Sequence, residues 1–255
     1  MSRSISSATR EPGHGTVKND QGHTYYRHGG NEAMPDGREE VDSRRPDRVP
    51  TPSALTKAAA LRLKADRSVR TDEPRRAVRF YQKSLKLNPR DHIAWNNMGV
   101  ALSRVGELRE AIDAYTQALK VRPTYSKAWF NKGKAFQQLG MYPAAQICYA
   151  NVLRINPKAT AAWINMGVAH RETGQNERAF QCYERALEVD PGSSVAWNNM
   201  GVLLTRTGDL QHALQCFNKA LEFDPGLHEA LYEREQVIAL LEQKRMVRLE
   251  AADEF

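Results

Sequence analysis

A block that begins with tryptophan and ends with glycine occurs four times in this chain, always 34 residues after the previous one. The four blocks are Trp95–Gly99, Trp129–Gly133, Trp163–Gly167 and Trp197–Gly201. The rest of each interval keeps the same register. In the first interval it carries a second glycine at Gly106, then Ala111, Tyr115 and Pro123. A fixed period of this length without insertions indicates short units stacked in one direction, rather than a single globular core.

Within each interval the apolar residues recur at helical spacing and fall into two groups. For residues 92–125 the pattern predicts a first helix of about 92–104, a turn at Gly106 that takes positive φ, and a second helix ended by a proline. Gly99 lies in the middle of the first helix, where glycine costs about 1 kcal/mol relative to alanine. We therefore expect the two helices to approach closely there, with the small Ala118 facing the glycine.

These residues, conserved in place through four consecutive copies, resemble the pattern of the tetratricopeptide repeat family. The resemblance implies an all-α fold, a right-handed α-solenoid of helix-turn-helix repeats in which each repeat contacts mainly its neighbours. It also implies a protein that holds other polypeptides. Counting by 34 gives five repeats: 58–91, 92–125, 126–159, 160–193 and 194–227. In the first repeat Leu61 and Asp72 replace the Trp and the turn Gly, as is expected at the end of an array.

The segments on either side of the repeats differ from them in composition. Residues 1–50 are rich in Gly, Pro, Ser, Arg, Asp and Glu and contain almost no aliphatic residues. Such a segment cannot bury enough apolar area to offset its ordering entropy, so we expect a disordered N-terminal tail. The array is predicted over residues 51–250. Its last part, 228–248, is predicted to be an amphipathic helix that covers the open end of the last repeat.

The formal net charge of +7 is concentrated in residues 51–90, which hold eleven Lys or Arg and three Asp or Glu. Such an excess attracts an acidic protein segment, nucleic acid or an anionic membrane surface. A solvated basic face on an end repeat is the alternative. No aromatic residues alternate with these charges, as they do in proteins that bind single-stranded nucleic acid. Nucleic acid is therefore a secondary candidate partner.

In the family that the chain resembles, the first helix of each repeat lines a concave groove. The resemblance places an asparagine of four repeats along that groove: Asn97, Asn131, Asn165 and Asn199. A narrower similarity links these positions to the repeat arm of the O-linked N-acetylglucosamine transferases, where an asparagine ladder holds the backbone of an extended polypeptide. A carboxamide has one acceptor and two donors, which match the C=O and N–H of a peptide unit. Local capping or solvation is the other role of Asn in the general repeat pattern.

Three further sets of side chains are expected beside this ladder. The residues that directly precede the four asparagines are Asn96, Phe130, Ile164 and Asn198. The residues about one turn later are Val100, Lys134, Val168 and Val202. Contiguous exposed apolar surface marks a partner site, unless packing between neighbouring first helices buries part of it. At the edge, arginines are expected to pair with acidic side chains of a ligand: Arg104, Arg171 and Arg206.

The sequence contains no pattern typical of a catalytic or metal site. It lacks a Ser-His-Asp arrangement, a phosphate-binding loop and the paired-cysteine spacing of zinc sites. Cys148, Cys182 and Cys216 are also 34 residues apart, and we expect them to be small packing residues. Equivalent sites on packed helices lie roughly 8–10 Å apart, beyond the roughly 7 Å Cα separation that a disulfide tolerates. We therefore expect no enzymatic activity, cofactor, metal or disulfide.

The sequence thus predicts an adaptor or scaffold that binds an extended segment of another protein. Two alternatives stay open: an electrostatic binder of nucleic acid or an acidic partner through the first repeat, and a regulatory subunit that delivers substrates to a separate enzyme. No apolar run approaches the roughly 20 residues of a membrane helix. The first residues also lack the apolar stretch of a secretory signal. A cytoplasmic location without membrane insertion is therefore expected.

Overall fold

The computed structural model describes residues 16–18, 24–26 and 50–253. The chain divides into two compact units, residues 1–44 and 45–255. The first contains two short antiparallel strands, β1 (Thr16–Lys18) and β2 (Thr24–Tyr26), with Val17 opposite Tyr25. The rest of the predicted disordered tail, except residue 50, lies outside the described part of the chain. The disorder of residues 1–50 therefore stays a prediction.

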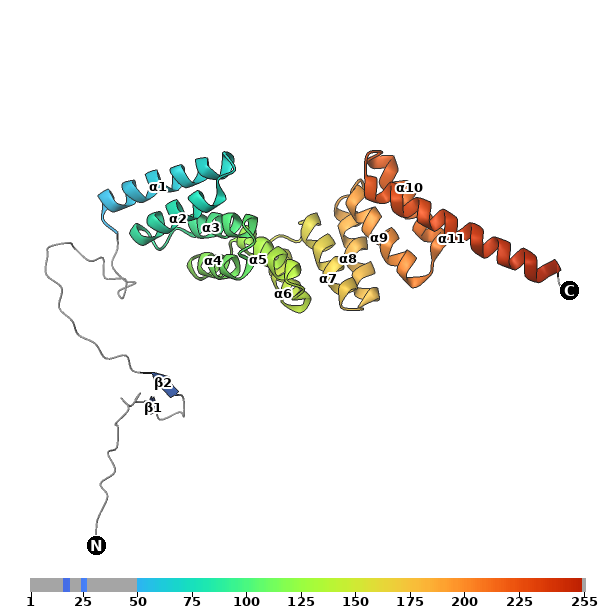
Figure 1. The fold of residues 1–255 in the computed structure, drawn as a ribbon, viewed down its shortest axis with the longest axis horizontal. Coiled ribbons are helices and arrows are strands. Elements are labelled where there is room, and N and C mark those ends of the chain that lie inside the picture. Colours follow the sequence, from blue (N-terminus) through green and yellow to red (C-terminus); the bar gives the residue numbers. More distant parts are fainter. Residues whose placement is uncertain (1–15, 19–23, 27–49, 254–255) are drawn as a thin grey trace, which may run out of the picture. The chain divides into compact units, whose positions relative to one another are not determined.

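The second unit is built from helices alone within its described residues, which confirms the all-α solenoid (Figure 1). Five pairs of antiparallel helices follow one another and a long last helix ends the series. The pairs are α1 (Pro52–Arg70) with α2 (Pro74–Leu87), α3 (His92–Arg104) with α4 (Leu108–Val121), α5 (Ser126–Gln138) with α6 (Tyr142–Ile155), α7 (Thr160–Glu172) with α8 (Asn176–Val189), and α9 (Ser194–Thr207) with α10 (Leu210–Phe223). The last helix is α11 (His228–Asp253), which is longer than the predicted 228–248.

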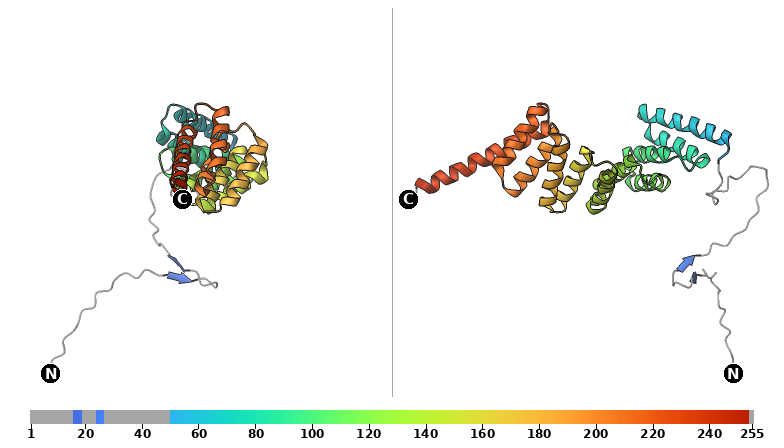
Figure 2. Two further views of the ribbon diagram at one scale, coloured as in Figure 1. Left: turned by 90° about the vertical axis from the view of Figure 1, so that its right-hand side faces the viewer. Right: turned by 180° about the vertical axis from the view of Figure 1, so that it is seen from behind.

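The helices of this array stack in sequence order. Each first helix packs against the second helix of its own pair and, from α3 on, against that of the preceding pair. Successive first helices also touch one another, and α9 touches α11 in the same way. From α3 on, successive first helices begin 34 residues apart, and α11 continues that series (Figures 1 and 2). One side of every first helix therefore occupies an equivalent place in the array.

Local signals explain where the helices begin and turn. Asp91 caps α3, because its Oδ1 accepts from the backbone N of Ile93 at 3.1 Å and of Ala94 at 3.0 Å. Gly106 follows α3 with φ of +84°, which glycine adopts without steric cost. In the first pair this turn position is taken by Asp72 with φ of 56°, consistent with the tolerance of Asp for the left-handed region.

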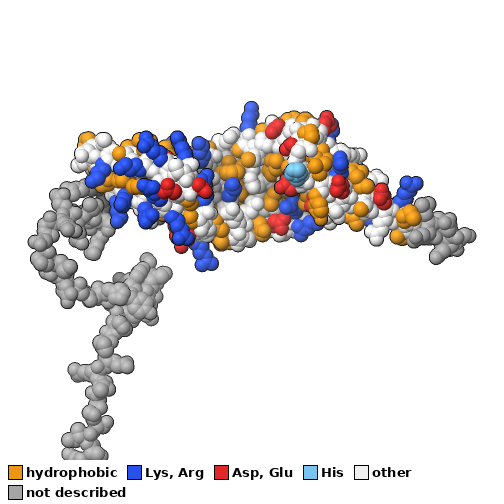
Figure 3. Space-filling model, turned by 45° about the horizontal axis from the view of Figure 1, so that its top comes forward, with side chains coloured by type: hydrophobic (Ala, Val, Ile, Leu, Met, Phe, Trp, Pro, Cys, Tyr) orange, Lys and Arg blue, Asp and Glu red, His pale blue; other side chains and the backbone are white. Residues whose placement is uncertain are grey.

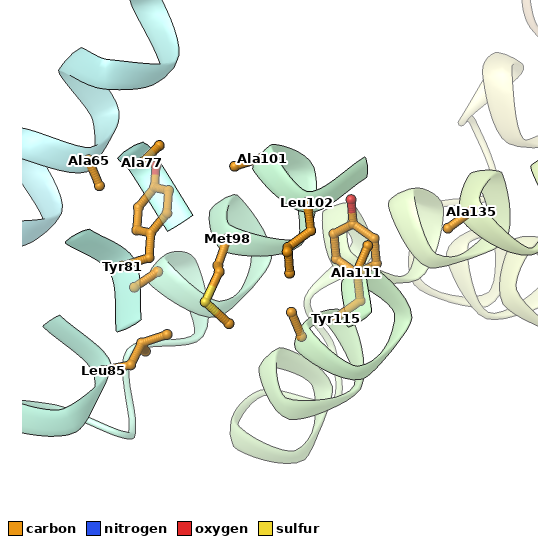
Figure 4. Packing of buried hydrophobic residues seen from close by; sticks show 12 residues of the cluster. Ala65, Ala77, Tyr81, Leu85, Met98, Ala101, Leu102, Ala111, Tyr115 and Ala135 are labelled. Carbon is orange, nitrogen blue, oxygen red and sulfur yellow. The ribbon is translucent and has the colours of Figure 1, made fainter. Parts of the chain in front are cut away.

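An aromatic ring, rather than an alanine, faces the glycine in the middle of each first helix. A Cβ on Gly99 would lie 2.5 Å from Cε1 of Tyr115, and one on Gly133 would lie 2.7 Å from Cε1 of Tyr149. The expectation that Ala118 faces Gly99 is therefore corrected. Glycine is needed because the ring of the second helix lies too close to the backbone of the first to leave room for a Cβ; Figure 4 shows one of these rings, Tyr115, in the core.

The core of the array is a series of clusters joined by the tryptophans. Each indole packs against two consecutive clusters, so that Trp163 touches the cluster of Val152 and Leu153 and also that of Ile164 and Tyr183. Each indole Nε1 also donates to the carbonyl of the proline six residues earlier, at 2.8 to 3.0 Å. The Trp of one unit and the Pro of the preceding unit are therefore a structural pair.

The last helix closes the end of the core. Ala230 and Val237 of α11 are fully buried against α10. None of the helices in the described part of the chain has the length and apolar character needed to cross a membrane.

Candidate functional site

The asparagines predicted to form a ladder lie on the aligned first helices. Asn97, Asn131, Asn165 and Asn199 belong to α3, α5, α7 and α9, and each is partly exposed. We call the side of these four helices that carries the asparagines the Asn face. Because successive first helices touch, the four carboxamides follow one another at equivalent places along the array.

At the N-terminal end the carboxamides form one hydrogen-bonded chain. Asn97 Nδ2 donates to Asp66 Oδ1 of α1 at 3.3 Å, and Tyr81 Oη donates to the same oxygen at 2.6 Å. Asn96 Nδ2 donates to Asn97 Oδ1 at 3.1 Å, and Asn131 Nδ2 donates to Asn96 Oδ1 at 3.0 Å. Burial and the neighbouring carboxylate raise the pKa of Tyr81, which keeps its hydroxyl protonated as a donor. This network fixes the orientation of two of the four ladder amides.

The two C-terminal carboxamides bond differently. Asn165 Nδ2 donates to the carbonyl of Ala161 at 2.7 Å, and Asn199 Nδ2 donates to that of Val195 at 2.8 Å. Each bond lies within one helix, between residues four apart. Asn199 Oδ1 also accepts from Arg171 Nη1 at 3.4 Å. The ladder amides are therefore equivalent in position but not in hydrogen bonding.

The residues beside the ladder asparagines turn toward the interior. Asn96 is only 4% exposed and Ile164 only 9%, and Phe130 is half-buried against Tyr149 with ring centroids 5.8 Å apart. Asn96 fits the alternative in which a neighbouring first helix buries it, because its Oδ1 accepts from Asn131 of α5, whereas Phe130 packs against Tyr149 of the second helix α6. Each of these residues directly precedes a ladder asparagine on its helix, so its side chain points in a different direction from the asparagine side chain.

Asn198 is the fourth member of that set, and its Oδ1 is buried without a hydrogen-bond partner among the described residues. The equivalent atom of Asn96 accepts from Asn131, 35 residues further along. The residue at that distance from Asn198 is Glu233, which has no side-chain amide to donate in the way Asn131 does.

The residues one turn after the asparagines remain accessible. Lys134 is exposed, and the three valines at the equivalent positions are half-buried: Val100, Val168 and Val202. The three edge arginines already have partners. Arg104 Nη1 donates to the carbonyl of Val69 at 3.2 Å, and Arg206 Nη1 donates to that of Arg171 at 3.4 Å. Both bonds join a first helix to the end of the preceding one.

Arg171 occupies a different position in its repeat and its Nε lies 3.1 Å from Glu172 Oε1. The three predicted arginines therefore make contacts within the protein, either between two first helices or within one helix. Any ligand carboxylate would compete with these contacts.

The sequence reasoning missed residues that lie four positions before the asparagines. Ile93 is 38% exposed and Val195 is 48% exposed, although both are aliphatic. Lys127 and Ala161 are exposed at the equivalent positions of α5 and α7. Residues four apart share one side of a helix, so these side chains belong to the Asn face. The helical spacing was the available signal, because it places them beside each ladder residue.

The basic residues of the first pair gather on its surface, over α1 and α2 (Figure 3). Arg62 pairs with Asp91 at 2.9 Å and Arg76 pairs with Glu73 at 2.9 Å. Other basic side chains of these helices are exposed and take part in none of the ion pairs within the described residues: Lys57, Lys64, Arg67, Arg70, Arg75, Arg79, Lys83 and Lys86. The array therefore has a strongly basic end.

Other polar residues have structural surroundings. Lys132 Nζ lies 5.8 Å from the ring centroid of Trp129 and 5.7 Å from that of Phe136. His170 Nδ1 lies 3.0 Å from Gln175 Oε1, and burial lowers the pKa of this histidine. The three cysteines are buried free thiols. In the described part of the chain, no group of three or more His, Cys, Asp or Glu is arranged to hold a metal ion.

A separate cavity of about 780 Å³ lies between α8, α9 and α10. Phe180, Trp197, Met200 and Leu204 line it, together with polar side chains of α10. By helical spacing, the three α9 residues point away from the side that carries Asn199. The cavity is therefore not part of the Asn face.

Comparison with protein families identifies the repeating unit. Three models of the tetratricopeptide repeat match residues 92–125, 126–159 and 158–225. Together they span residues 92–225, which is 134 of the 255 residues. No curated protein matches the chain.

Solved structures show the same fold. The MamA RS-1 ArsTM double mutant is 25% identical, with a TM-score of 0.63 over 66% of this chain and 95% of that one. MamA 41-end from Desulfovibrio magneticus RS-1 is 24% identical, with a TM-score of 0.63 over 67% and 97%. YrrB, described as a TPR protein with an unusual peptide-binding site, is 23% identical, with a TM-score of 0.60 over 71% and 98%.

Proposed function

This chain belongs to the tetratricopeptide repeat family, whose members generally mediate interactions between proteins, and we propose that it is a non-catalytic adaptor whose Asn face binds an extended segment of another protein. The groove of this family runs along the first helices, which here carry Asn97, Asn131, Asn165 and Asn199. One observation carries the proposal. Each ladder asparagine is flanked, four residues before and three after, by an accessible side chain, and in three of the four repeats both flanking side chains are apolar.

The ladder amides would bind the ligand backbone in two ways. Asn97 and Asn131 are held by the network to Asp66, so they meet a peptide unit with little loss of side-chain entropy. Asn165 and Asn199 keep a second Nδ2 hydrogen and acceptor capacity on Oδ1 while they bond their own helix. Each would contribute about 0.5–1.5 kcal/mol to binding.

The experiment is a selection of random 12-residue peptides on the immobilised full chain, followed by affinity measurements on the enriched peptides. Asn165→Ala with Asn199→Ala should weaken their binding by about 1–3 kcal/mol if the two contributions roughly add. Asn131 is unsuitable for truncation, because its loss would leave the buried Asn96 Oδ1 without a donor.

The matched control is Asn151→Ala on α6. Its Nδ2 also donates to the carbonyl four residues earlier, Ile147, at 2.9 Å, but it lies on a second helix. We expect this control to bind like wild type. Equal affinities of wild type and the Asn165/Asn199 variant for every enriched peptide would contradict the proposal.

A second candidate function is electrostatic binding by the basic end of the array, favoured by the exposed Arg and Lys side chains of α1 and α2 (Figure 3). Its partner would be nucleic acid or an acidic surface. Charge reversal at Arg75 and Arg79 should abolish such binding, and the affinity should fall steeply with salt concentration.

A cytoplasmic location, predicted from the sequence, remains part of the proposal.

A further inference from the structure

The side chains that flank the ladder asparagines are aliphatic in three repeats and cationic in one. On α3 the flanking residues are Ile93 and Val100, on α7 they are Ala161 and Val168, and on α9 they are Val195 and Val202. On α5 both flanking positions are lysines, Lys127 and Lys134. The Asn face is therefore aliphatic in three repeats and doubly cationic in the one between α3 and α7.

Both lysines are available to a ligand. Each is exposed, and neither takes part in the ion pairs found among the described residues. They lie seven residues apart, two turns of α5, with Asn131 between them on the same side. The Asp66 carboxylate of α1, which contacts Asn97, already accepts hydrogen bonds from Tyr81 and Asn97.

From this pattern we infer that the bound segment carries an acidic residue opposite α5, with an aliphatic residue on each side of it opposite α3 and α7. This inference rests on the proposed function. It commits the partner to one chemistry: an extended protein segment with a central carboxylate and apolar flanks.

The spacing of the ligand residues follows from geometry. Packed helices lie about 8–10 Å apart, and an extended chain advances about 3.3 Å per residue. Neighbouring repeats are therefore matched by ligand residues about three apart. The expected motif has a central Asp or Glu, with one aliphatic residue three positions before it and another three positions after it. The motif is the same in either chain direction.

The test uses the random 12-residue peptide selection on three forms of the full chain. These are wild type, Lys127→Glu with Lys134→Glu, and a control with Arg109→Glu and Lys120→Glu. The control reverses the same number of charges on two exposed basic residues of the second helix α4. On wild type and the control we expect Asp or Glu to be enriched at one position, with aliphatic residues three before and three after.

The charge-reversed form should keep the aliphatic positions and replace the central acid by Lys or Arg. A peptide selected on wild type should bind it at least about tenfold more weakly, because two attractive pairs become repulsive. Replacing its central acid by Lys should restore binding to the reversed form and weaken binding to wild type.

The outcomes separate this inference from the proposed function. Peptides that depend on Asn165 and Asn199 but show no central acid, or that bind the reversed form unchanged, would overturn the inference and leave the proposed function in place. A selection in which no peptide binds wild type more tightly than the Asn165→Ala, Asn199→Ala variant would overturn both.

Discussion

Single side chains set the distance between the two helices of each repeat. Gly133 lies against the ring of Tyr149, which is fully buried and whose hydroxyl donates to Gln137 Oε1 at 3.0 Å. The hydroxyl bond holds the ring against α5, because Gly133 and Gln137 lie four residues apart on that helix. The local cost of a helical glycine is tolerated because it lets a large aromatic residue pack against backbone atoms.

Gly133→Ala tests that packing. Its Cβ would lie 2.7 Å from Tyr149 Cε1, and we expect overpacking to destabilise the array by about 1–3 kcal/mol. In a Tyr149→Ala background the same change should be neutral or stabilise by up to about 1 kcal/mol, because only the helix propensity of alanine then acts. Urea unfolding of the four proteins measures the coupling. Equal effects of Gly133→Ala in both backgrounds would refute steric contact with the ring.

Burial of the cysteines predicts a loss of stability at alkaline pH. Burial raises the pKa of Cys148, Cys182 and Cys216 from 9.0 to about 11. Between these values the folded chain retains protons that the unfolded chain has lost. The stabilisation is therefore fully present below pH 9 and is lost as pH rises through 11, by at most about 3 kcal/mol per thiol.

A chain with Cys148→Ala, Cys182→Ala and Cys216→Ala is the matched comparison. Thermal unfolding at pH 8 and pH 10.5 should show a smaller drop in stability for this variant than for wild type. An equal drop in both would show that the thiols do not contribute, leaving the buried tyrosines as the cause.

At the scale of helices and repeats, the tryptophans connect one cluster of the core to the next. Trp163 packs against two clusters, and its Nε1 donates to the carbonyl of Pro157 at 2.9 Å. Because contacts in such an array are mostly between neighbours, one indole carries much of the coupling between adjacent repeats.

Trp163→Ala should destabilise the chain by about 3–5 kcal/mol and broaden or split its unfolding transition. Trp163→Phe should cost less, because it keeps most of the packing and loses mainly a hydrogen bond of about 1 kcal/mol. Calorimetry and denaturant melts distinguish these results. An unchanged melting temperature for Trp163→Ala would be incompatible with its place between clusters.

The repeat pattern allowed the fold to be predicted, because Trp, Gly and Pro act through local or nearest-neighbour contacts. The turn at Gly106 and the helices around it follow from such signals. The ring facing each glycine was not predicted, because spacing along one helix does not show which residue of its partner approaches. For Asn96 the sequence left exposure and burial open, because its surroundings include Asn131, 35 residues away.

On the scale of the whole array, two surfaces compete as the binding site. The Asn face spans four repeats, and the side chains that flank its asparagines are aliphatic except at Lys127 and Lys134. The basic end, in contrast, is confined to α1 and α2. The sequence indicated both, because the period locates the asparagines and the charge count locates the basic repeat. It did not rank the side chains within the Asn face, because their exposure is set by contacts between first helices.

The two surfaces also differ in their expected response to salt. Binding through many phosphate contacts should weaken steeply as salt concentration rises. Binding on the Asn face should change little, because most of its contacts are amide and aliphatic and only two exposed cations are involved. Affinities of a selected peptide at several salt concentrations measure this difference.

The most direct test of binding on the Asn face is to locate a bound peptide by thiol protection. The native cysteines are buried and their raised pKa keeps them as thiols near pH 7.5, so an introduced cysteine reports alone. Three exposed positions serve as single reporters: Ala161→Cys on the Asn face, Arg79→Cys on the basic end, and Ala150→Cys on α6 as control. A saturating peptide selected on wild type should slow labelling at Ala161→Cys alone. Slower labelling at Arg79→Cys with an unchanged rate at Ala161→Cys would contradict binding on the Asn face.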